Sequence, residues 1–445
     1  MKAFIETIKN IFKIEELRQR ILYTLGLILI YRLGSHIVLP TVDPNVLKEF
    51  KFSDRASQGV LGIIDMFAGG AFSRASIFAL GIMPYISASI IVQLLGVIVP
   101  YFQRLQKEGE SGRRKLNQIT RYLTILVLII QSSAYLSQIP RNAWVPNISE
   151  GFLVFLSIIV LTTGTMFIMW LGEKITDKGI GNGISLIIMI GIIARLPQAL
   201  LFELGARLER QGGGLVMFMV EIIFLFIVFI LSILLIQGTR RIPIQYAKRI
   251  IGNKQYGGVR NYLPLKVNAA GVMPIIFAQA IVMIPMSFTR FSQNLSGFVA
   301  AFANPTGFWY NFTSALLIII FTYFYTAITV NSNLIAEELK KNGGFIPGIK
   351  PGKKTAEFID TVMSRITLPG SLFLAFVAIL PAFAMKLGIS HSFAYFYGGT
   401  SLLILVGVIL DTLQQIESYL LMRHYDGLMK TGRIKGRSGS YASSI

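Results

Sequence analysis

Long apolar stretches separated by short polar segments run along nearly the whole chain. A helix needs roughly 20 predominantly apolar residues to cross the hydrocarbon core of a bilayer. The pattern therefore predicts an all-α, polytopic membrane protein with ten transmembrane helices. These ten spans are predicted at residues 21–39, 76–98, 118–138, 152–172, 183–201, 214–237, 269–289, 313–331, 369–387 and 394–414.

Composition and charge agree with this pattern and indicate its orientation. The 445 residues are 53% hydrophobic and 14% charged, and the mean hydropathy is +0.62, values outside the range of ordinary soluble domains. Ten crossings return the chain to the side on which it started, and most of the 42 lysines and arginines lie in segments on that side. Because basic loops are retained in the cytoplasm, both termini are predicted to be cytoplasmic.

The two ends of the chain are predicted to lie outside the spans. Residues 1–20 form a charged amphipathic stretch, which predicts an interfacial helix leading into span 1 rather than a removable signal peptide. Residues 415–445 are predicted to be a cytoplasmic tail. Between them, residues 21–201 would form an N-terminal half of five spans and residues 202–414 a C-terminal half of five.

A short repeated motif supports this division into halves. The sequence GIMPYI occupies residues 81–86 in span 2, and GVMPII occupies residues 271–276 in span 7. Five spans per half would place the second copy in an inverted, pseudo-symmetric orientation, and inverted repeats form pathways at their interface. Pro84 and Pro274 would each free a backbone carbonyl inside a span, which a membrane tolerates where neighbouring helices or a water-filled cavity satisfy it. We expect these two spans to line a cavity; kinked packing helices are the alternative.

Two of the predicted cytoplasmic loops are unusually basic or long. Residues 239–268 carry seven lysines and arginines and no acidic residue, and residues 332–368 form a long loop that contains GGFIPGIKPGKKT. Attraction to anionic lipid is one explanation. Docking of an acidic partner such as ribosomal RNA is the interpretation we favour, because long loops in compact proteins are often functional.

The sequence offers little for covalent chemistry. It has no Gly-rich Lys-Ser/Thr phosphate loop and no His-Glu-x-x-His zinc motif, and the absence of cysteine excludes disulfides and cysteine-ligated metals. The three histidines, His36, His391 and His424, fall near span ends or in loops. We therefore predict no enzymatic activity, no cofactor and no metal.

An ion-coupled transporter or flippase with a small-molecule site at the midplane is the main alternative. Such proteins keep ionisable groups at membrane depth, yet Glu221 is the only acid well inside a predicted span. Asp411, Arg32 and Arg195 lie towards span ends. A single carboxylate favours a passive conduit instead.

A passive conduit needs a seal, and the N-terminal half offers one. Ile82 and Ile86 are four residues apart on one helical face, and a ring of aliphatic side chains can close a narrow lumen by dewetting. The preceding segment 61–67, LGIIDMF, is too short to span a bilayer. It is followed by Gly69 and Gly70, which would let it hinge against the constriction.

Several long motifs in this order resemble the SecY family of protein-conducting channel subunits, and the resemblance covers essentially the whole chain. The matching sequences are GGAFSRASIFALGIMPYISASIIVQLL (69–95), GEKITDKGIGNGIS (172–185), RRIPIQYAKR (240–249), LPLKVNAAGVMPIIF (263–277), GGFIPGIKPG (343–352) and YGGTSLLILVGVILD (397–411). The resemblance implies a channel that passes unfolded secretory polypeptides across the membrane and releases transmembrane segments sideways into lipid.

The resemblance also implies roles for individual residues. A plug at about 61–73 would contain Ile64 and Phe67 and the Gly69-Gly70 hinge, while Asp65 in the same segment has no partner that the sequence indicates. The pore ring would consist of Ile82, Ile86, Ile188, Ile276 and Ile404. Spans 2 and 3 against spans 7 and 8 would form a lateral gate whose residues include Pro84, Gln93, Asn268 and Pro274. A hydrogen bond from Gln93 or Asn268 would hold this gate shut.

Finally, the resemblance implies partners and a location. Docking residues for the ribosome and the SecA motor ATPase would be Arg240, Arg241, Lys248, Arg249 and Lys350. At Lys350 the family pattern usually has arginine, and lysine keeps the charge but lacks the planar bidentate fork. The implied channel subunits are SecE and SecG, the implied substrates are signal sequences and nascent polypeptides, and the implied surroundings are the lipids of the bacterial cytoplasmic (inner) membrane.

Overall fold

The computed structural model of the chain describes residues 14–49, 62, 65–146, 148–209, 214–246, 249–251, 254–256, 260–288 and 306–430. Several predictions therefore fall outside the described residues. These are most of the N-terminal amphipathic helix, Ile64, Lys248, the side chain of Arg249 and the end of the C-terminal tail.

All ten predicted spans contain a helix in the described structure. The α-helices are α2 (Glu15–Gly34), α3 (Pro44–Glu49), α6 (Met83–Ile98), α7 (Pro100–Lys107), α8 (Glu110–Leu136), α9 (Glu150–Lys178), α10 (Gly183–Glu209), α11 (Gly214–Gln237), α12 (Met273–Phe288), α14 (Phe308–Thr329), α15 (Ser332–Lys341), α16 (Lys353–Lys386), α17 (His391–Ala394) and α18 (Gly399–Lys430).

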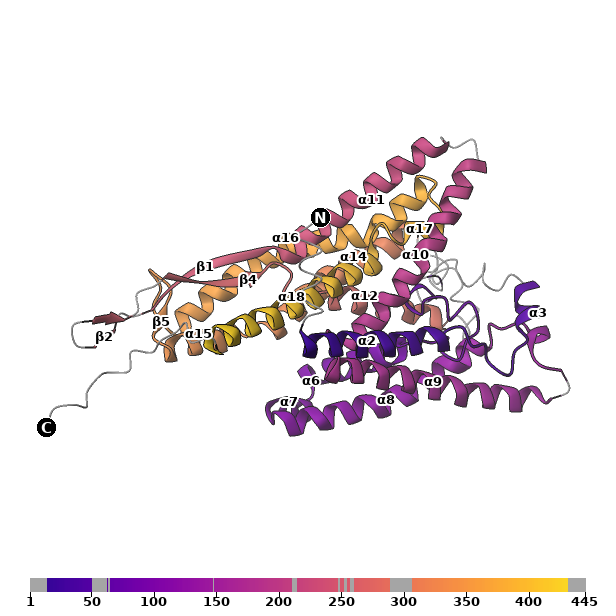
Figure 1. Cartoon of the computed structure of the whole chain (residues 1–445), viewed down its shortest axis with the longest axis horizontal. Coiled ribbons are helices and arrows are strands. Elements are labelled where there is room, and N and C mark those ends of the chain that lie inside the picture. Colours follow the sequence, from indigo (N-terminus) through magenta and orange to yellow (C-terminus); the bar gives the residue numbers. More distant parts are fainter. Residues whose placement is uncertain are drawn as a thin grey trace.

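The helices form two lobes that follow the chain order (Figure 1). In one lobe α6 packs against α8, α8 against α9, and α9 against α2. In the other, α12, α14, α16 and α18 pack together, and α11 lies against α18. The helix α10 contacts α9 and α2 of the first lobe and α11, α17 and α18 of the second. The helix α10, predicted to be the last span of the N-terminal half, therefore lies between the two lobes, and the division into two halves at residue 201 stays a prediction.

In the described part of the chain, seven helices are long and apolar enough to cross a bilayer, namely α8, α9, α10, α11, α14, α16 and α18. An eighth candidate is α6 taken together with α7, although their axes bend by 98°. The helices α2 and α12 occupy the positions of predicted spans 1 and 7, but α2 carries three arginines and α12 has 16 residues. The chain is thus a multi-pass membrane protein, and the full count of ten crossings remains a prediction.

The two copies of the repeated motif adopt the same local structure. In each copy the glycine has a left-handed backbone, with φ of +55° at Gly81 and +64° at Gly271, and a helix begins two residues later. Pro84 and Pro274 therefore lie in the first turn of α6 and α12, where no intrahelical hydrogen bond is lost. The prediction that these prolines free a carbonyl inside a span is wrong; they begin the helices instead.

The helix α10 is longer than predicted and reaches Glu209, past the expected end at residue 201. Arg195, which the apolar pattern places towards a span end, consequently lies near the middle of the helix. Gly183–Glu209 remains one helix although it contains Pro197. The charged end after residue 201 continues the helix beyond the apolar stretch, so hydropathy alone does not reveal it.

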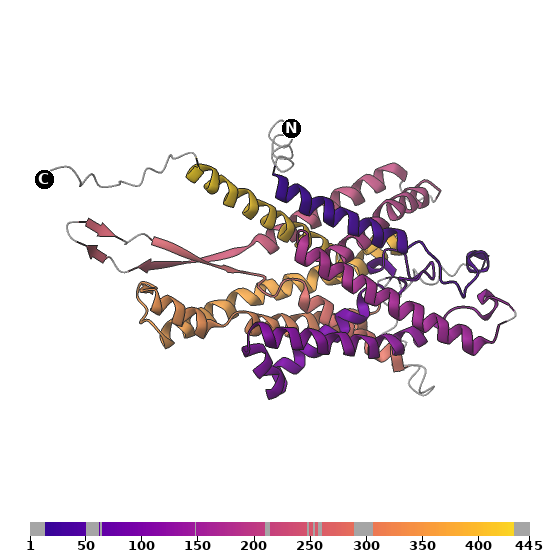
Figure 2. The same cartoon turned by 60° about the horizontal axis from the view of Figure 1, so that its bottom comes forward.

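The basic loop 239–268 is not irregular, so the described structure is not entirely α-helical. Strands β1 (Thr239–Tyr246) and β4 (Arg260–Lys266) pair antiparallel from Thr239↔Lys266 to Gln245↔Arg260. Strands β2 (Arg249–Ile251) and β3 (Lys254–Tyr256) extend this hairpin, which projects beyond the helix ends (Figure 2).

The two basic loops are joined into one body. Strand β5 (Gly344–Phe345), from the loop 332–368, pairs with the end of β1. Ile242 and Ile244, alternate residues of β1, are buried in an apolar cluster with Leu339 of α15, Ile346 and Ile359 of α16. Because a strand directs alternate side chains to opposite faces, Arg241 lies on the face opposite these isoleucines. Arg240 shares their face but is also exposed, near the start of the strand.

Candidate pore and plug site

The segment that the sequence predicts to be a plug lies buried at the centre of the molecule. Met66, Phe67 and Phe72 are 5%, 6% and 3% exposed, and they belong to the main apolar cluster, which contains side chains from both lobes. The segment runs through turns from residue 68 to the start of α6. Residues 65–67 are helical, and the turns that follow them are enclosed by helices, as a membrane requires for irregular backbone.

Glycines allow the segment to approach α10 closely. Gly69 and Gly70 have left-handed backbones, with φ of +63° and +84°, which favour glycine. On α10, a Cβ at Gly191 would lie 2.5 Å from the carbonyl oxygen of Phe67 and 3.2 Å from the amide nitrogen of Gly69. Because Gly191 has no side chain, the backbone of the plug packs directly against the backbone of α10 at this position.

The structure also supplies the partner of Asp65 that the sequence did not indicate. The Asp65 carboxylate is 2% exposed and forms an ion pair with Arg195 of α10. Its Oδ1 accepts a hydrogen bond from the backbone N–H of Ser73 at 2.8 Å, and Arg195 donates to the Ser73 hydroxyl at 2.8 Å. The amide of Gly70 donates to the Asp65 carbonyl at 2.8 Å. Asp65, Ser73 and Arg195 thus form a closed polar triangle, which we call the plug triangle.

Two further arginines bind backbone carbonyls of the plug. Arg74 donates to the carbonyl oxygens of Gly69 and Gly70, both at 2.8 Å, and Arg32 of α2 donates to that of Gly69 at 3.3 Å. Burial, and then the neighbouring Arg32, lower the pKa of the Arg74 guanidinium, as expected where cations lie close together with little solvent.

Two tyrosines of the first lobe also form hydrogen bonds with the plug. Tyr31 of α2 donates to the carbonyl oxygen of Ala68 at 3.4 Å, and Tyr135 of α8 donates to that of Phe72 at 2.8 Å. Both tyrosines are almost fully buried. Each carbonyl also accepts a backbone hydrogen bond, Ala68 from Ala71 and Phe72 from Ala75, at 3.2 Å each. The tyrosines therefore add a second hydrogen bond to turns of the plug and connect them to α2 and α8.

The residues predicted to form the pore ring gather around this plug. Ile82, Ile188 and Ile404 are 4%, 5% and 2% exposed and belong to the same apolar cluster as Met66 and Phe67. Ile86 and Ile276 are partly buried and pack against that cluster. These side chains come from α6 and the residue before it, α10, α12 and α18. The five isoleucines thus belong to, or pack against, one apolar cluster that spans both lobes, and their arrangement as a ring stays a prediction.

Among the residues that the structure describes, no hydrogen bond joins Gln93 or Asn268 across the predicted lateral gate. The Gln93 amide donates to Ser89 Oγ of its own helix at 3.2 Å, and the Oδ1 atom of Asn268 is buried without a partner in the described structure. Asn268 precedes α12 rather than lying on it. Pro84 and Pro274, both buried, begin α6 and α12, as described above.

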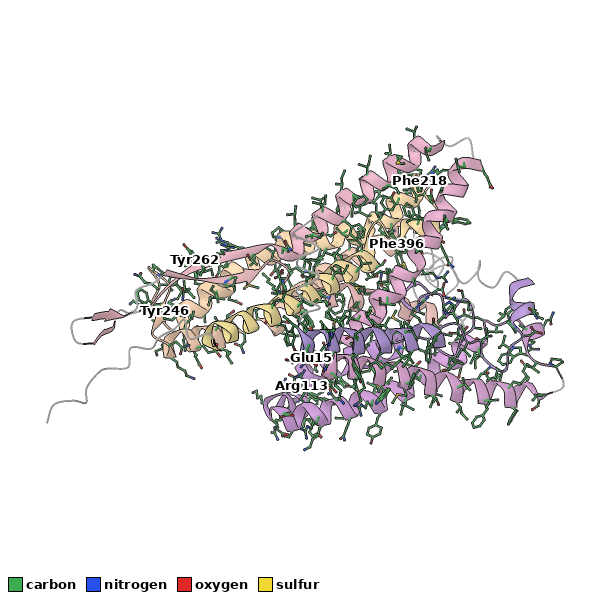
Figure 3. All side chains as sticks on the ribbon, viewed as in Figure 1. Glu15, Arg113, Phe218, Tyr246, Tyr262 and Phe396 are labelled. Carbon is green, nitrogen blue, oxygen red and sulfur yellow. The ribbon has the colours of Figure 1, made fainter. Side chains whose placement is uncertain are left out.

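The strands β1, β4 and β5 together with α15 and the start of α16 form what we call the hairpin body. The docking residues that are described lie on its surface. Arg240 and Arg241 are exposed on β1, and Lys350 is exposed just before α16. Tyr246 and Tyr262 mark the two long strands of this hairpin in Figure 3, and Tyr262 is exposed. The pairing of β1 with β5 brings the two loops, 239–268 and 332–368, into a single basic surface.

One buried charge cluster was missed by the sequence reasoning. Arg207 of α10 forms ion pairs with Glu203 of the same helix and with Glu221 of α11, and all three side chains are buried or nearly so. Glu203 Oε2 also accepts from the amide of Ser390 at 2.9 Å, and Arg207 donates to the Gly388 carbonyl at 3.2 Å. The i, i+4 spacing of Glu203 and Arg207 was the available signal. Because Glu221 is paired with Arg207 in this cluster, the acid that the sequence places well inside a span does not favour the transporter alternative.

Comparisons with known proteins agree with this architecture. The sequence profile of the SecY family matches residues 76–413. A protein translocase subunit SecY of Streptomyces scabiei is 43% identical over 443 residues, which cover 94% of this chain and 98% of that protein. The protein of the same description in Mycobacterium bovis (strain ATCC BAA-935 / AF2122/97) is 41% identical over 450 residues, covering 97% of this chain and 100% of that protein.

Solved structures show the same fold at lower sequence identity. One described as the structure of a protein conducting channel is similar with a TM-score of 0.65 at 19% identity, covering 90% of this chain and 92% of that one. A second, on the plug domain of the SecY protein, reaches 0.62 at 19% identity with the same coverage. A third, Sec61 in the canine ribosome-channel complex from the endoplasmic reticulum, reaches 0.61 at 18% identity with the same coverage.

The two lobes, the buried plug segment with its turns from residue 68 onward and these similarities place the fold among helical membrane channels. With more than 40% identity over nearly the full length of its relatives, the chain belongs to the SecY family.

Proposed function

We propose that the protein is the central subunit of a protein translocase. Unfolded secretory polypeptides pass between its two lobes, and apolar transmembrane segments leave sideways into lipid. The proposal rests on the family and on one observation above all. The buried segment that contains Phe67 shares a single apolar cluster with isoleucines from four different parts of the chain. Such a cluster provides a dewetted constriction that stays closed when no polypeptide is present.

In this proposal the segment at 61–73 is the plug, and Ile82, Ile86, Ile188, Ile276 and Ile404 are the ring around the passing polypeptide. Because α10 lies between the lobes, it connects the two sides of the constriction. The similar structure with a plug domain is described as one in which the plug stabilises the closed state and maintains a membrane seal. Five aliphatic side chains offer a translocating chain no hydrogen-bonding partner, so the constriction accepts many sequences.

The lateral gate would open between α6 with α8 and α12 with α14. Pro84 and Pro274 begin α6 and α12, and Gln93 and Asn268 lie on or beside them. The buried, unpartnered Oδ1 of Asn268 favours opening here, because a polar atom without a partner contributes no stabilisation to the closed state. No covalent chemistry, cofactor or metal takes part.

Energy would come from partners on the cytoplasmic side. The hairpin body, with Arg240, Arg241 and Lys350 exposed, offers a basic surface to the SecA motor ATPase or to the RNA and proteins of the ribosome. A related Sec61 channel is known in a complex with the ribosome. The distribution of lysine and arginine supports a cytoplasmic location of both termini and of this surface, and the bacterial relatives support a bacterial membrane. SecE and SecG would complete the channel in the inner membrane.

A crosslinking experiment tests this proposal. A photo-crosslinking residue at position 276 is placed in channels that hold a stalled secretory precursor. We expect a crosslink to the precursor that disappears when the precursor is released. The matched control is position 223 of α11, where Ile223 is 60% exposed on the outer surface and should meet lipid.

Two results would contradict the proposal. Absence of a crosslink at both 276 and 82, with the precursor demonstrably docked, would make these isoleucines packing residues. Equal crosslinking at 276 and at 223 would show that the precursor lies around the protein and not within it.

A further inference from the structure

The plug triangle is the strongest feature that the proposed function leaves without a role. We infer that the ion pair between Asp65 and Arg195, closed by Ser73, is a latch that sets how strong a signal sequence must be to open the channel. Asp65 and Arg195 are thus positioning residues that determine specificity. This inference rests on the proposed function, because it names the contact that holds the plug in the closed state.

The chemistry of the latch differs from that of the other plug contacts. Arg32, Arg74, Tyr31 and Tyr135 all donate to backbone carbonyls of the segment. Asp65, by contrast, contributes a side-chain carboxylate of the plug. Its partner Arg195 belongs to α10, which lies between the lobes. The latch therefore joins the plug to the helix whose position depends on the separation of the lobes.

Because the ion pair is buried, the free energy needed to break it can distinguish strong signal sequences from weak ones. Asp65 is 2% exposed and the side chain of Arg195 is 25% exposed, so the ion pair is largely withdrawn from water. Breaking a buried ion pair leaves a charge without compensation, which is far more unfavourable than losing an exposed pair. A signal sequence must therefore supply enough free energy on inserting between the lobes to separate Asp65 from Arg195.

Ser73 makes the latch all-or-none. Its amide is held by Asp65 and its hydroxyl by Arg195, at 2.8 Å each. Asp65 and Ser73 are bound to each other through the Ser73 amide, and both are bound to α10 through Arg195, so loss of the arginine separates the two ends of this segment from α10 together. The segment between them contains the Gly69-Gly70 pair, which has a left-handed backbone.

The first test measures how strongly the channel rejects a precursor with a weakened signal sequence, which we call its stringency, and not translocation activity alone. Asp65→Asn and Arg195→Gln are compared with the unaltered channel, in the complete complex, using one precursor with a normal signal and one with a shortened apolar signal. Loss of the pair should raise translocation of the weakened precursor by about tenfold, with little change for the normal one. The matched control is Glu110→Gln, which breaks the exposed pair with Arg114 and should change neither.

A charge exchange separates a latch from a purely structural contact. Asp65→Arg combined with Arg195→Asp restores an ion pair of reversed polarity and should restore rejection of the weakened precursor. A structural role predicts a lower yield of folded channel in each variant and no gain for the weakened precursor. That result would overturn the inference.

The absence of cysteine from the 445 residues allows a second, independent test. In the variant Asp65→Cys with Arg195→Cys, the reduced channel lacks the latch and should accept the weakened precursor. Bridging the two thiols with a short bifunctional reagent should then block translocation of both precursors. Full translocation through the bridged channel would show that Asp65 need not leave Arg195, which overturns the inference.

The outcomes also distinguish the latch from the proposed function. If the unaltered channel passes the normal precursor and all variants keep the same stringency, the latch fails and the function stands. If the unaltered channel passes no precursor at all, the proposed function itself fails.

Discussion

Arg207 on α10 binds Glu221 on α11, and the same guanidinium binds Glu203 four residues before it. One arginine thus pairs with two carboxylates. Arg207 also donates to the Gly388 carbonyl, and Glu203 accepts from the Ser390 amide, both in the segment between α16 and α17. The cluster therefore fastens the outer part of α10 to the second lobe. The plug triangle fastens an earlier part of α10 to the plug, so one helix carries both contacts.

Replacing Glu221 and replacing Arg207 should change the stability of the protein by unequal amounts. Glu221→Gln leaves the Glu203–Arg207 pair balanced, so we expect translocation to stay within about twofold and the free energy of unfolding to change by about 1 kcal/mol or less. Arg207→Gln leaves two buried carboxylates unpaired and should destabilise the protein by about 3–5 kcal/mol. Thermal unfolding of the purified complex measures both. Loss of translocation in Glu221→Gln with unchanged stability would favour an ion-coupled mechanism instead.

Gly191 is predicted to be essential for the resting seal. In Gly191→Ala the new Cβ would meet the Phe67 carbonyl oxygen at 2.5 Å, which is backbone and cannot rotate away. Overpacking of about 1–3 kcal/mol should increase the displaced fraction of the plug by about fivefold or more. Ion conductance of reconstituted channels without precursor measures this increase. The control Gly205→Ala lies on the same helix, where a Cβ meets nothing within 4 Å, and should leave the conductance unchanged.

Deletion of residues 62–70 should raise the resting conductance further, because it removes Phe67 and the backbone that Arg32 and Arg74 hold. Translocation of a normal precursor should continue, since the isoleucines around the plug remain. Planar-bilayer recordings with and without precursor provide the measurement. An unchanged resting conductance would mean that the segment does not seal the channel.

The basic face of the hairpin should determine partner binding. Arg240→Gln with Arg241→Gln removes two exposed charges without disturbing the buried Ile242 and Ile244. We expect weaker ribosome binding, and a salt dependence whose slope falls by about 1 for each phosphate that the hairpin no longer neutralises. Sedimentation of the complex with ribosomes over a range of salt concentrations measures this slope. Arg113→Gln with Lys115→Gln, exposed on α8, provides the control; an equal loss of binding there would indicate attraction to net charge alone.

Much of the architecture was determined by the sequence itself. Apolar stretches of bilayer length predicted helices in ten places, and the described structure has a helix in each of them, because a helix is the only open structure that satisfies its own backbone in lipid. The repeated motif at Gly81 and Gly271 was also meaningful, since both copies form the same left-handed glycine followed by a helix start. Its prolines were misread because an apolar run does not show where within it the helix begins.

The tertiary structure alone decided the polar contacts. Asp65 and Arg195 lie 130 positions apart, and nothing local to either residue identifies the other. The same holds for the pairing of β1 with β5, which turned two separate basic loops into one surface. Apolar length is a property of one segment, and the sequence records it directly. The partner of a buried charge depends on how segments pack, because only the packed state withdraws that charge from water and requires it to be compensated.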